Sequence, residues 1–126
     1  NRFVADFIGR SNFLNGTIES SDTVCLANGT RVPIATHGRT GEAVSISLRP
    51  ERVQLVDRGA TPEGRPALDG EVSAFTFLGS GVVYKVALDW MTVEVRSENR
   101  PGVPRRDVGE AVSLWWRDDA IALVKE

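Results

Sequence analysis

The chain has 126 residues, of which 41% are hydrophobic and 25% are charged, a composition typical of a globular domain and not of a disordered or fibrous chain. This length accommodates one domain with a core, alone or with a short appendage. The net charge of −2 gives no strong attraction to nucleic acid or anionic membranes. A single cysteine excludes an internal disulfide. No apolar run reaches the roughly 20 residues of a membrane-spanning helix.

Residues 1–9 are predicted to form the only helix. Asn1 is a favourable N-cap and Gly9 a favourable C-terminal stop. One apolar stripe at helical spacing is formed by Phe3, Val4, Phe7 and Ile8. So short a helix is marginal alone in water, so we expect Phe3, Phe7 and Ile8 to dock on a partner. Because the sequence begins at Asn1 without methionine, we also expect it to be a fragment of a longer chain.

The first third of the chain predicts short strands. Residues 12–20 alternate in the manner of a strand, with a bulge or bend expected at Gly16. Residues 23–26 and 30–34 flank an Asn-Gly pair, which favours a hairpin turn. Residues 43–48 alternate again, with Val, Ile and Leu on one face.

The next segment contains two interruptions. Arg49-Pro50-Glu51 ends the preceding strand because proline has no backbone donor, and extended structure resumes at 53–56. Residues 59–66 are dense in glycine and proline and predict a loop.

Residues 70–90 have the clearest pattern in the chain. Two alternating runs flank Gly79-Ser80-Gly81, which predicts a β-hairpin. Val72, Ala74, Thr76 and Leu78 are expected on one face, and Ser73, Phe75 and Phe77 on the other. Because both faces are largely apolar, we expect a closed small barrel with Phe75 and Phe77 in its core.

The last third predicts a strand at 92–96, a polar loop at 98–109, and a closing hairpin of 111–117 and 120–124 around Asp118-Asp119. The chain thus contains about nine or ten short strands and no internal repeat. The sequence therefore predicts an all-β fold of short antiparallel strands with one terminal helix.

Several stretches resemble the C-terminal region of ABC-importer ATP-binding subunits, of the spermidine/putrescine type in particular. The stretches are Asn1-Arg2-Phe3-Val4-Ala5-Asp6-Phe7-Ile8-Gly9, Asn12-Phe13-Leu14, Leu48-Arg49-Pro50-Glu51, Phe77-Leu78-Gly79-Ser80 and Val112-Ser113-Leu114-Trp115. Each is weak alone, but together their order and spacing cover nearly the whole chain. Two positions depart from the family's pattern. Trp116 is a second tryptophan where the family usually has one, and Trp90 occupies a position where a small polar residue or glycine is usual.

The resemblance implies that residues 1–11 are the terminal helix and hinge of an ATPase domain. It implies that residues 12–126 are an OB-like barrel called the transport-associated OB (TOBE) domain, with a regulatory role. This segment lacks a G-x-x-x-x-G-K-[ST] loop, so we expect no catalysis and no cofactor here, ATP and Mg²⁺ belonging to the parent subunit. Expected partners are a second copy, the parent ATPase domain and the importer's membrane subunits, at the cytoplasmic face of the plasma membrane.

The candidate interface or regulatory residues within the barrel are Arg49, Glu51, Trp90 and Trp116. Arg49-Pro50-Glu51 is either a turn at a subunit contact or a structural turn in which Pro50 ends a strand and the two charged side chains satisfy each other or nearby backbone groups. Trp115 and Trp116 must point to opposite faces of a strand, so one fills the core and one is partly exposed. Trp90 lies in a predicted turn, where it is exposed or folds back over the end of the barrel.

Neither a metal site nor a nucleophilic pair is predicted. Cys25 and His37 are the only residues of their kinds and have no ligand-like neighbours in sequence. Arg100, Arg105 and Arg106 give one loop a positive charge, either as a solvated loop or as a contact for an anion or an acidic partner.

A second class of function is an OB-like barrel that binds nucleic acid or a small oxyanion. Such a surface combines a basic groove with stacking aromatic residues. Here Lys and Arg total 15 against 17 Asp and Glu, and the aromatic residues are not interleaved with basic ones. We therefore expect no nucleic-acid partner.

Overall fold

The computed structural model describes residues 11–125 and is built from strands, turns and two short 3₁₀ helices, so the predicted all-β class is confirmed. The helix predicted at residues 1–9, with Phe3, Phe7 and Ile8, lies outside the described residues. The elements are β1 (Asn12–Ser20), β2 (Thr23–Leu26), β3 (Arg31–Pro33), β4 (Ala43–Leu48), η1 (Pro50–Arg52), β5 (Gln54–Asp57), β6 (Leu68–Leu78), β7 (Gly81–Ala87), β8 (Thr92–Glu98), β9 (Ala111–Trp115), η2 (Asp118–Ala120) and β10 (Ile121–Lys125). Within the described range, no helix has the length and hydropathy needed to cross a membrane.

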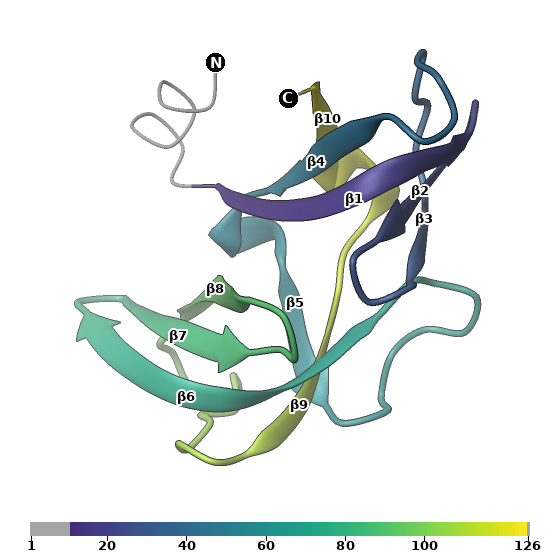
Figure 1. Cartoon of the computed structure of the whole chain (residues 1–126). Coiled ribbons are helices and arrows are strands. Elements are labelled where there is room, and N and C mark those ends of the chain that lie inside the picture. Colours follow the sequence, from purple (N-terminus) through teal and green to yellow (C-terminus); the bar gives the residue numbers. More distant parts are fainter. Residues whose placement is uncertain (1–10, 126) are drawn as a thin grey trace.

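The strands form two five-stranded antiparallel sheets, ordered β10-β4-β1-β2-β3 and β5-β9-β6-β7-β8. Figure 1 shows the first sheet above the second, with η1 and the segment before β10 connecting them. The chain leaves the first sheet after β4, builds the whole second sheet, and returns as β10. The predicted closing hairpin is therefore wrong. β9 pairs with β5 and β6 whereas β10 pairs with β4, because the chain changes sheets at η2.

The first sheet follows the predicted pattern except at one glycine. β2 and β3 form the predicted hairpin, and Gly29 adopts a φ of +91° in its turn. The register of β1 shifts between Ile18 and Ser20, so the bulge does not lie at Gly16. Gly16 is instead required by close packing, since a Cβ there would lie 2.6 Å from the carbonyl oxygen of Cys25.

The β6–β7 hairpin forms as predicted, but a bulge changes which side chains share a face. Its register shifts between Val72 and Ala74, and from there Phe75 pairs with Tyr84. Phe75 and Phe77 therefore share a face with the buried Tyr84, whose ring contacts Phe75 edge-on at a centroid distance of 6.2 Å. This part of β6 extends beyond the core, and Phe75 and Phe77 are 38% and 49% exposed. The prediction that both are core residues is wrong.

The core is one continuous cluster of side chains from both sheets. Trp116 is its largest fully buried side chain, while Trp115 on the opposite face is half-buried beneath Arg65. Trp90 is half-buried and packs against the core from the β7–β8 turn, which is closed by a Leu88 N–H to Met91 carbonyl hydrogen bond of 2.8 Å. Trp90 thus folds back against the core, and its role at an interface or with a ligand stays a prediction.

One buried side chain joins the two sheets directly. The Asn12 amide of β1 donates to the carbonyl oxygens of Leu48, at the end of β4, and of Glu94 in β8, at 3.1 and 2.9 Å. Its Oδ1 accepts from the Glu94 N–H at 2.8 Å. Asn12 thereby satisfies both backbone groups of Glu94 on the outer edge of the second sheet.

A buried arginine fixes the long loop between β8 and β9. Arg106 is 9% exposed, and its guanidinium contacts the carboxylates of Asp57 and, at 2.7 Å, of Glu110. Its backbone N–H donates to the Tyr84 hydroxyl at 3.0 Å. The hydrogen bond from Arg106, followed by one from the Asp107 N–H, holds the pKa of Glu110 below its ordinary value. The Arg106 side chain is thus structural, whereas its neighbours Arg105 and Asp107 are exposed.

Replacing Asn12 with alanine is expected to lower the free energy of unfolding by at least about 2 kcal/mol, because several buried backbone groups lose their partner at about 1–3 kcal/mol each. Urea denaturation of the purified chain measures this difference. Asn15→Ala is the matched control, since Asn15 lies on the same strand, is exposed, and accepts from Ser45 within the first sheet only. Equal losses for the two variants would contradict the role assigned to Asn12.

Replacing Glu110 with glutamine is expected to make stability less sensitive to acid. A carboxylate with a depressed folded-state pKa stabilises the fold above its unfolded pKa, and this contribution disappears as the pH falls through the folded value. The wild type should therefore lose more unfolding free energy than the variant between neutral pH and the region below the ordinary pKa of 4.5. Urea melts across that range provide the comparison, and parallel curves would show that the Arg106–Glu110 contact contributes nothing.

Candidate functional site

One candidate site is a groove of about 480 Å³ between β5 and β8, the two outer strands of the second sheet. It opens where the sheet curls round without closing, because each of these strands hydrogen-bonds to a neighbour on one side only. In Figure 1, β5 runs between the two halves of the molecule and β8 lies beside it at the top of the lower half. We call this site the seam groove.

The lining of the seam groove is mostly polar. Glu51 of η1, Arg96 and Glu98 of β8 contribute charged groups, and Gln54 and Ser97 contribute neutral ones. Val53 and Val95 are buried and form apolar lining. Glu98 also pairs with Arg100, at 2.5 Å. Such a mixture suits a small polar molecule or a polypeptide segment that contacts the strand edges.

The groove offers no evident catalytic or metal chemistry. Across residues 11–125, no group of three His, Cys, Asp or Glu side chains is placed to hold a metal ion. Its carboxylates lie beside a guanidinium, and neither a histidine nor a cysteine lines it. The arrangement therefore favours recognition of a ligand or partner.

Of the predicted site residues, Glu51 lies in the seam groove and Arg49 is exposed beside it. Pro50 is buried, and the turn is closed by the Arg52 N–H donating to the Arg49 carbonyl at 2.9 Å. No ion pair joins Arg49 to Glu51. It is Arg52 that pairs with a carboxylate, that of Asp119 at 3.0 Å. Pro50 thus ends the strand as predicted, without an ion pair between Arg49 and Glu51, and a role for this turn at a subunit contact stays a prediction.

Among the described residues, the two tryptophan candidates do not line this groove. Trp116 is 1% exposed in the core, so its predicted surface role is wrong, and Trp115 is the more exposed of the two. Trp90 packs on the core from a different turn. The alternation of the sequence shows that Trp115 and Trp116 point to opposite faces of one strand, but not which of the two faces the core.

Sequence reasoning also missed the β8 side of the groove. The sequence pattern that could have revealed this side is an alternation in β8. There Glu94, Arg96 and Glu98 alternate with Val93, Val95 and Ser97, which is typical of a strand with one charged face. The exposure of Phe75 and Phe77 was missed because this part of β6 extends beyond the core, which the alternation of the sequence does not show.

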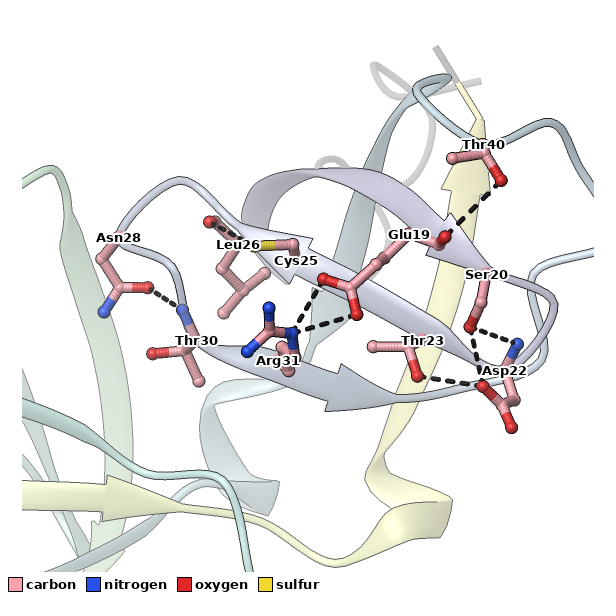
Figure 2. A network of polar contacts seen from close by, with 10 residues as sticks. All are labelled: Glu19, Ser20, Asp22, Thr23, Cys25, Leu26, Asn28, Thr30, Arg31 and Thr40. Atoms are coloured by element: carbon pink, nitrogen blue, oxygen red, sulfur yellow. Dashed lines mark hydrogen bonds and ion pairs between the residues drawn. The ribbon is translucent and has the colours of Figure 1, made fainter.

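A second polar cluster lies on the outer side of the first sheet, and Figure 2 shows how its groups bond to one another. Arg31 Nε donates to both carboxylate oxygens of Glu19, at 2.8 and 3.0 Å. The Ser20 hydroxyl, at 2.8 Å, and the Thr23 hydroxyl donate to Asp22 and lower the pKa of that carboxyl. These contacts link β1 to β3 and hold the turn between β1 and β2, which indicates a structural role for the cluster.

The three arginines of the 98–109 loop are likewise engaged within the protein. Arg100 pairs with Glu98, and Arg105 donates to Asn99 while lying 5.0 Å over the ring of Phe77. Arg106 is buried with its two carboxylates. The loop is solvated at Arg100 and Arg105, as one of the two alternatives predicts, and only the Arg106 side chain is buried.

Comparison with known proteins identifies relatives for almost the whole chain. Residues 46–124 match the family model of the TOBE domain. The chain is 34% identical to the spermidine/putrescine import ATP-binding protein PotA of Pseudomonas aeruginosa, over 98% of this chain and 37% of the relative. The protein of the same name from Rubrobacter xylanophilus is 34% identical, over 92% of this chain and 32% of that protein. The chain thus spans about a third of the length of these relatives.

Among solved structures, the cytoplasmic molybdate-binding protein ModG has a similar fold. Its TM-score is 0.77, over 91% of this chain and 96% of the ModG chain, at 14% sequence identity. This likeness shows the fold alone and confirms the predicted OB-like architecture. With the family match over β4 to β10 and the relatives over nearly the whole sequence, the chain belongs to the TOBE domain family.

Proposed function

We propose that this chain is the non-catalytic C-terminal regulatory domain of the ATP-binding subunit of a bacterial ABC importer for polyamines or a related solute. In this role it contributes to contacts between two subunits and modulates transport. The parent subunit works at the cytoplasmic face of the membrane with its membrane-spanning partners, and it binds ATP and Mg²⁺ through its own ATPase domain. Residues 1–11 form the connection to that domain, and residues 12–126 form the regulatory domain.

The observation that carries this proposal is the alignment with the import ATP-binding proteins. The match covers 98% of this chain but only 37% of the P. aeruginosa relative, as expected of one domain of a larger subunit. The geometry is compatible with this role, because the described surface offers a recognition groove and an exposed aromatic hairpin without a catalytic constellation.

The rival class, a barrel that binds nucleic acid or an oxyanion, has less support. An electrostatic site for either ligand needs cationic groups that are available to it. Arg100, Arg105 and Arg106 are engaged with neighbouring groups, and the net charge is −2. The similarity to ModG, at 14% identity, adds nothing on ligand binding.

The isolated chain is expected neither to bind nor to hydrolyse ATP. Binding at 100 times the dissociation constant adds about 2.7 kcal/mol of stability, which a thermal melt with Mg-ATP detects readily. We expect unchanged melting temperatures with Mg-ATP and with a matched concentration of magnesium chloride. A rise specific to the nucleotide would contradict the assignment as a non-catalytic domain.

A domain exchange tests the proposed place in the importer. Residues 12–126 would replace the matching segment of the P. aeruginosa relative, and the chimera would be reconstituted with that transporter's membrane subunits. We expect assembly and spermidine uptake, with the subunit truncated before this segment as the control. A chimera whose grafted domain melts cooperatively, yet which does not assemble, would contradict the proposal.

A further inference from the structure

The distal part of β6 has an edge without a neighbouring strand. β6 pairs with β9 through residues 68–71 and with β7 through residues 71–78. Hydrogen bonds of Val72 with Gly109 and Glu110, at 2.8 and 3.0 Å, extend the β9 side by one residue. Beyond this point, within the described chain, Ser73 lies at the bulge and residues 74–78 pair with β7 alone, and all six residues are exposed. We call these residues the β6 edge.

The pairing with β7 determines which backbone groups of the β6 edge point outward. Gly79 and Ser80 form a two-residue turn flanked by the Leu78–Gly81 pair, which in such hairpins is hydrogen-bonded. Hydrogen-bonded and non-bonded pairs alternate along an antiparallel ladder, so Thr76 is bonded to β7 whereas Phe75 and Phe77 are not. The N–H and C=O groups of Phe75 and Phe77 therefore point to the open side.

The side chains of the β6 edge lack the features that usually protect an exposed strand. Phe75, Phe77 and Leu78 are 38%, 49% and 45% exposed. The sequence Ser-Ala-Phe-Thr-Phe-Leu has no charge, proline or glycine, whereas natural edge strands are commonly blocked by lysine, proline or a covering segment. Arg105 lies over one ring, that of Phe77, and leaves the strand edge open.

We propose that the β6 edge pairs antiparallel with the β6 edge of a second copy of this chain about a two-fold axis. With Thr76 at the axis, Phe75 faces Phe77 of the second copy, and the reciprocal pair forms by symmetry. This register joins outward-pointing groups to outward-pointing groups and creates four backbone hydrogen bonds. It also creates two cross-strand aromatic pairs, of the kind that stabilises antiparallel strands.

The absence of charge favours a second copy as the occupant, and the size of the edge limits how tightly it can bind. Because residues 73–78 carry no charge, self-pairing places no like charges opposite each other. Six strand residues span about 20 Å, which is short for the roughly 800 Å² per partner of a standard stable interface. The isolated chain should therefore associate in a concentration-dependent manner, with additional contacts supplied by the parent subunit. This inference specifies a surface for the subunit contact in the proposed function.

Site-directed cross-linking tests the register. In a Cys25→Ser background, Thr76→Cys places two thiols in a non-hydrogen-bonded pair with Cα atoms about 4.5 Å apart, within disulfide range. Ala74→Cys is the matched control, because it is exposed on the same strand but its two copies would lie about 14 Å apart along the strands. Under oxidised glutathione we expect a covalent dimer from Thr76→Cys, none from Ala74→Cys alone, and a heterodimer when Ala74→Cys is mixed with Leu78→Cys.

Equal cross-linking of Thr76→Cys and Ala74→Cys, or none of Thr76→Cys, would overturn the proposal. Loss of the Thr76→Cys dimer when residues 1–10 are deleted would assign the contact to that segment and overturn it too. In sedimentation, Phe75→Lys with Phe77→Lys should give a monomer, whereas Val108→Lys, which changes an exposed apolar residue off the strand, should not. These outcomes are independent of the domain exchange, so failure of one proposal is distinguishable from failure of the other.

Discussion

The architecture depends on the three hydrogen bonds by which Asn12 connects the two sheets. They fix the end of β4 against β8, and so define where η1 leaves the first sheet and where the second sheet begins. The groups that Asn12 bonds belong to the backbone of Leu48 and of Glu94. The contact therefore fixes the position of the backbone in β4 and β8 and not only of side chains. The seam groove lies next to this junction, with Glu51 from η1 on one side and Arg96 from β8 on the other.

The second sheet combines a rigid base with a projecting hairpin. At its base, Arg106 links Asp57 of β5 to Glu110 before β9, while Tyr84 of β7 accepts from its backbone. At its other end, the bulge after Val72 turns Phe75 and Phe77 toward the Tyr84 face at a point where the core has ended. The distal part of β6 is therefore hydrogen-bonded to β7 on one edge and open on the other. The open edge is suited to pairing with another strand.

These features suit a domain that works through contacts. The second sheet leaves two kinds of strand edge open. The edges at the seam groove are recessed and mostly polar, whereas the β6 edge projects and is aromatic. A recessed edge is suited to a ligand or peptide segment, whereas a projecting edge is suited to a flat partner such as a second copy. Under the proposed function, the two edges would give the domain one surface for a ligand and a separate one for a second copy.

The sequence alone determined the strands, the β2–β3 and β6–β7 hairpins and the family, because alternation and turn residues are local signals and the motifs lie along the whole chain. Tertiary structure decided which sheet each strand joins, so the predicted pairing of residues 111–117 with 120–124 was wrong. Alternation also fixes only that Trp115 and Trp116 oppose each other; packing determined that Trp116 faces the core. A single bulge moved Phe75 and Phe77, and long-range ion pairs buried Arg106, because register and charge pairing depend on residues distant in sequence.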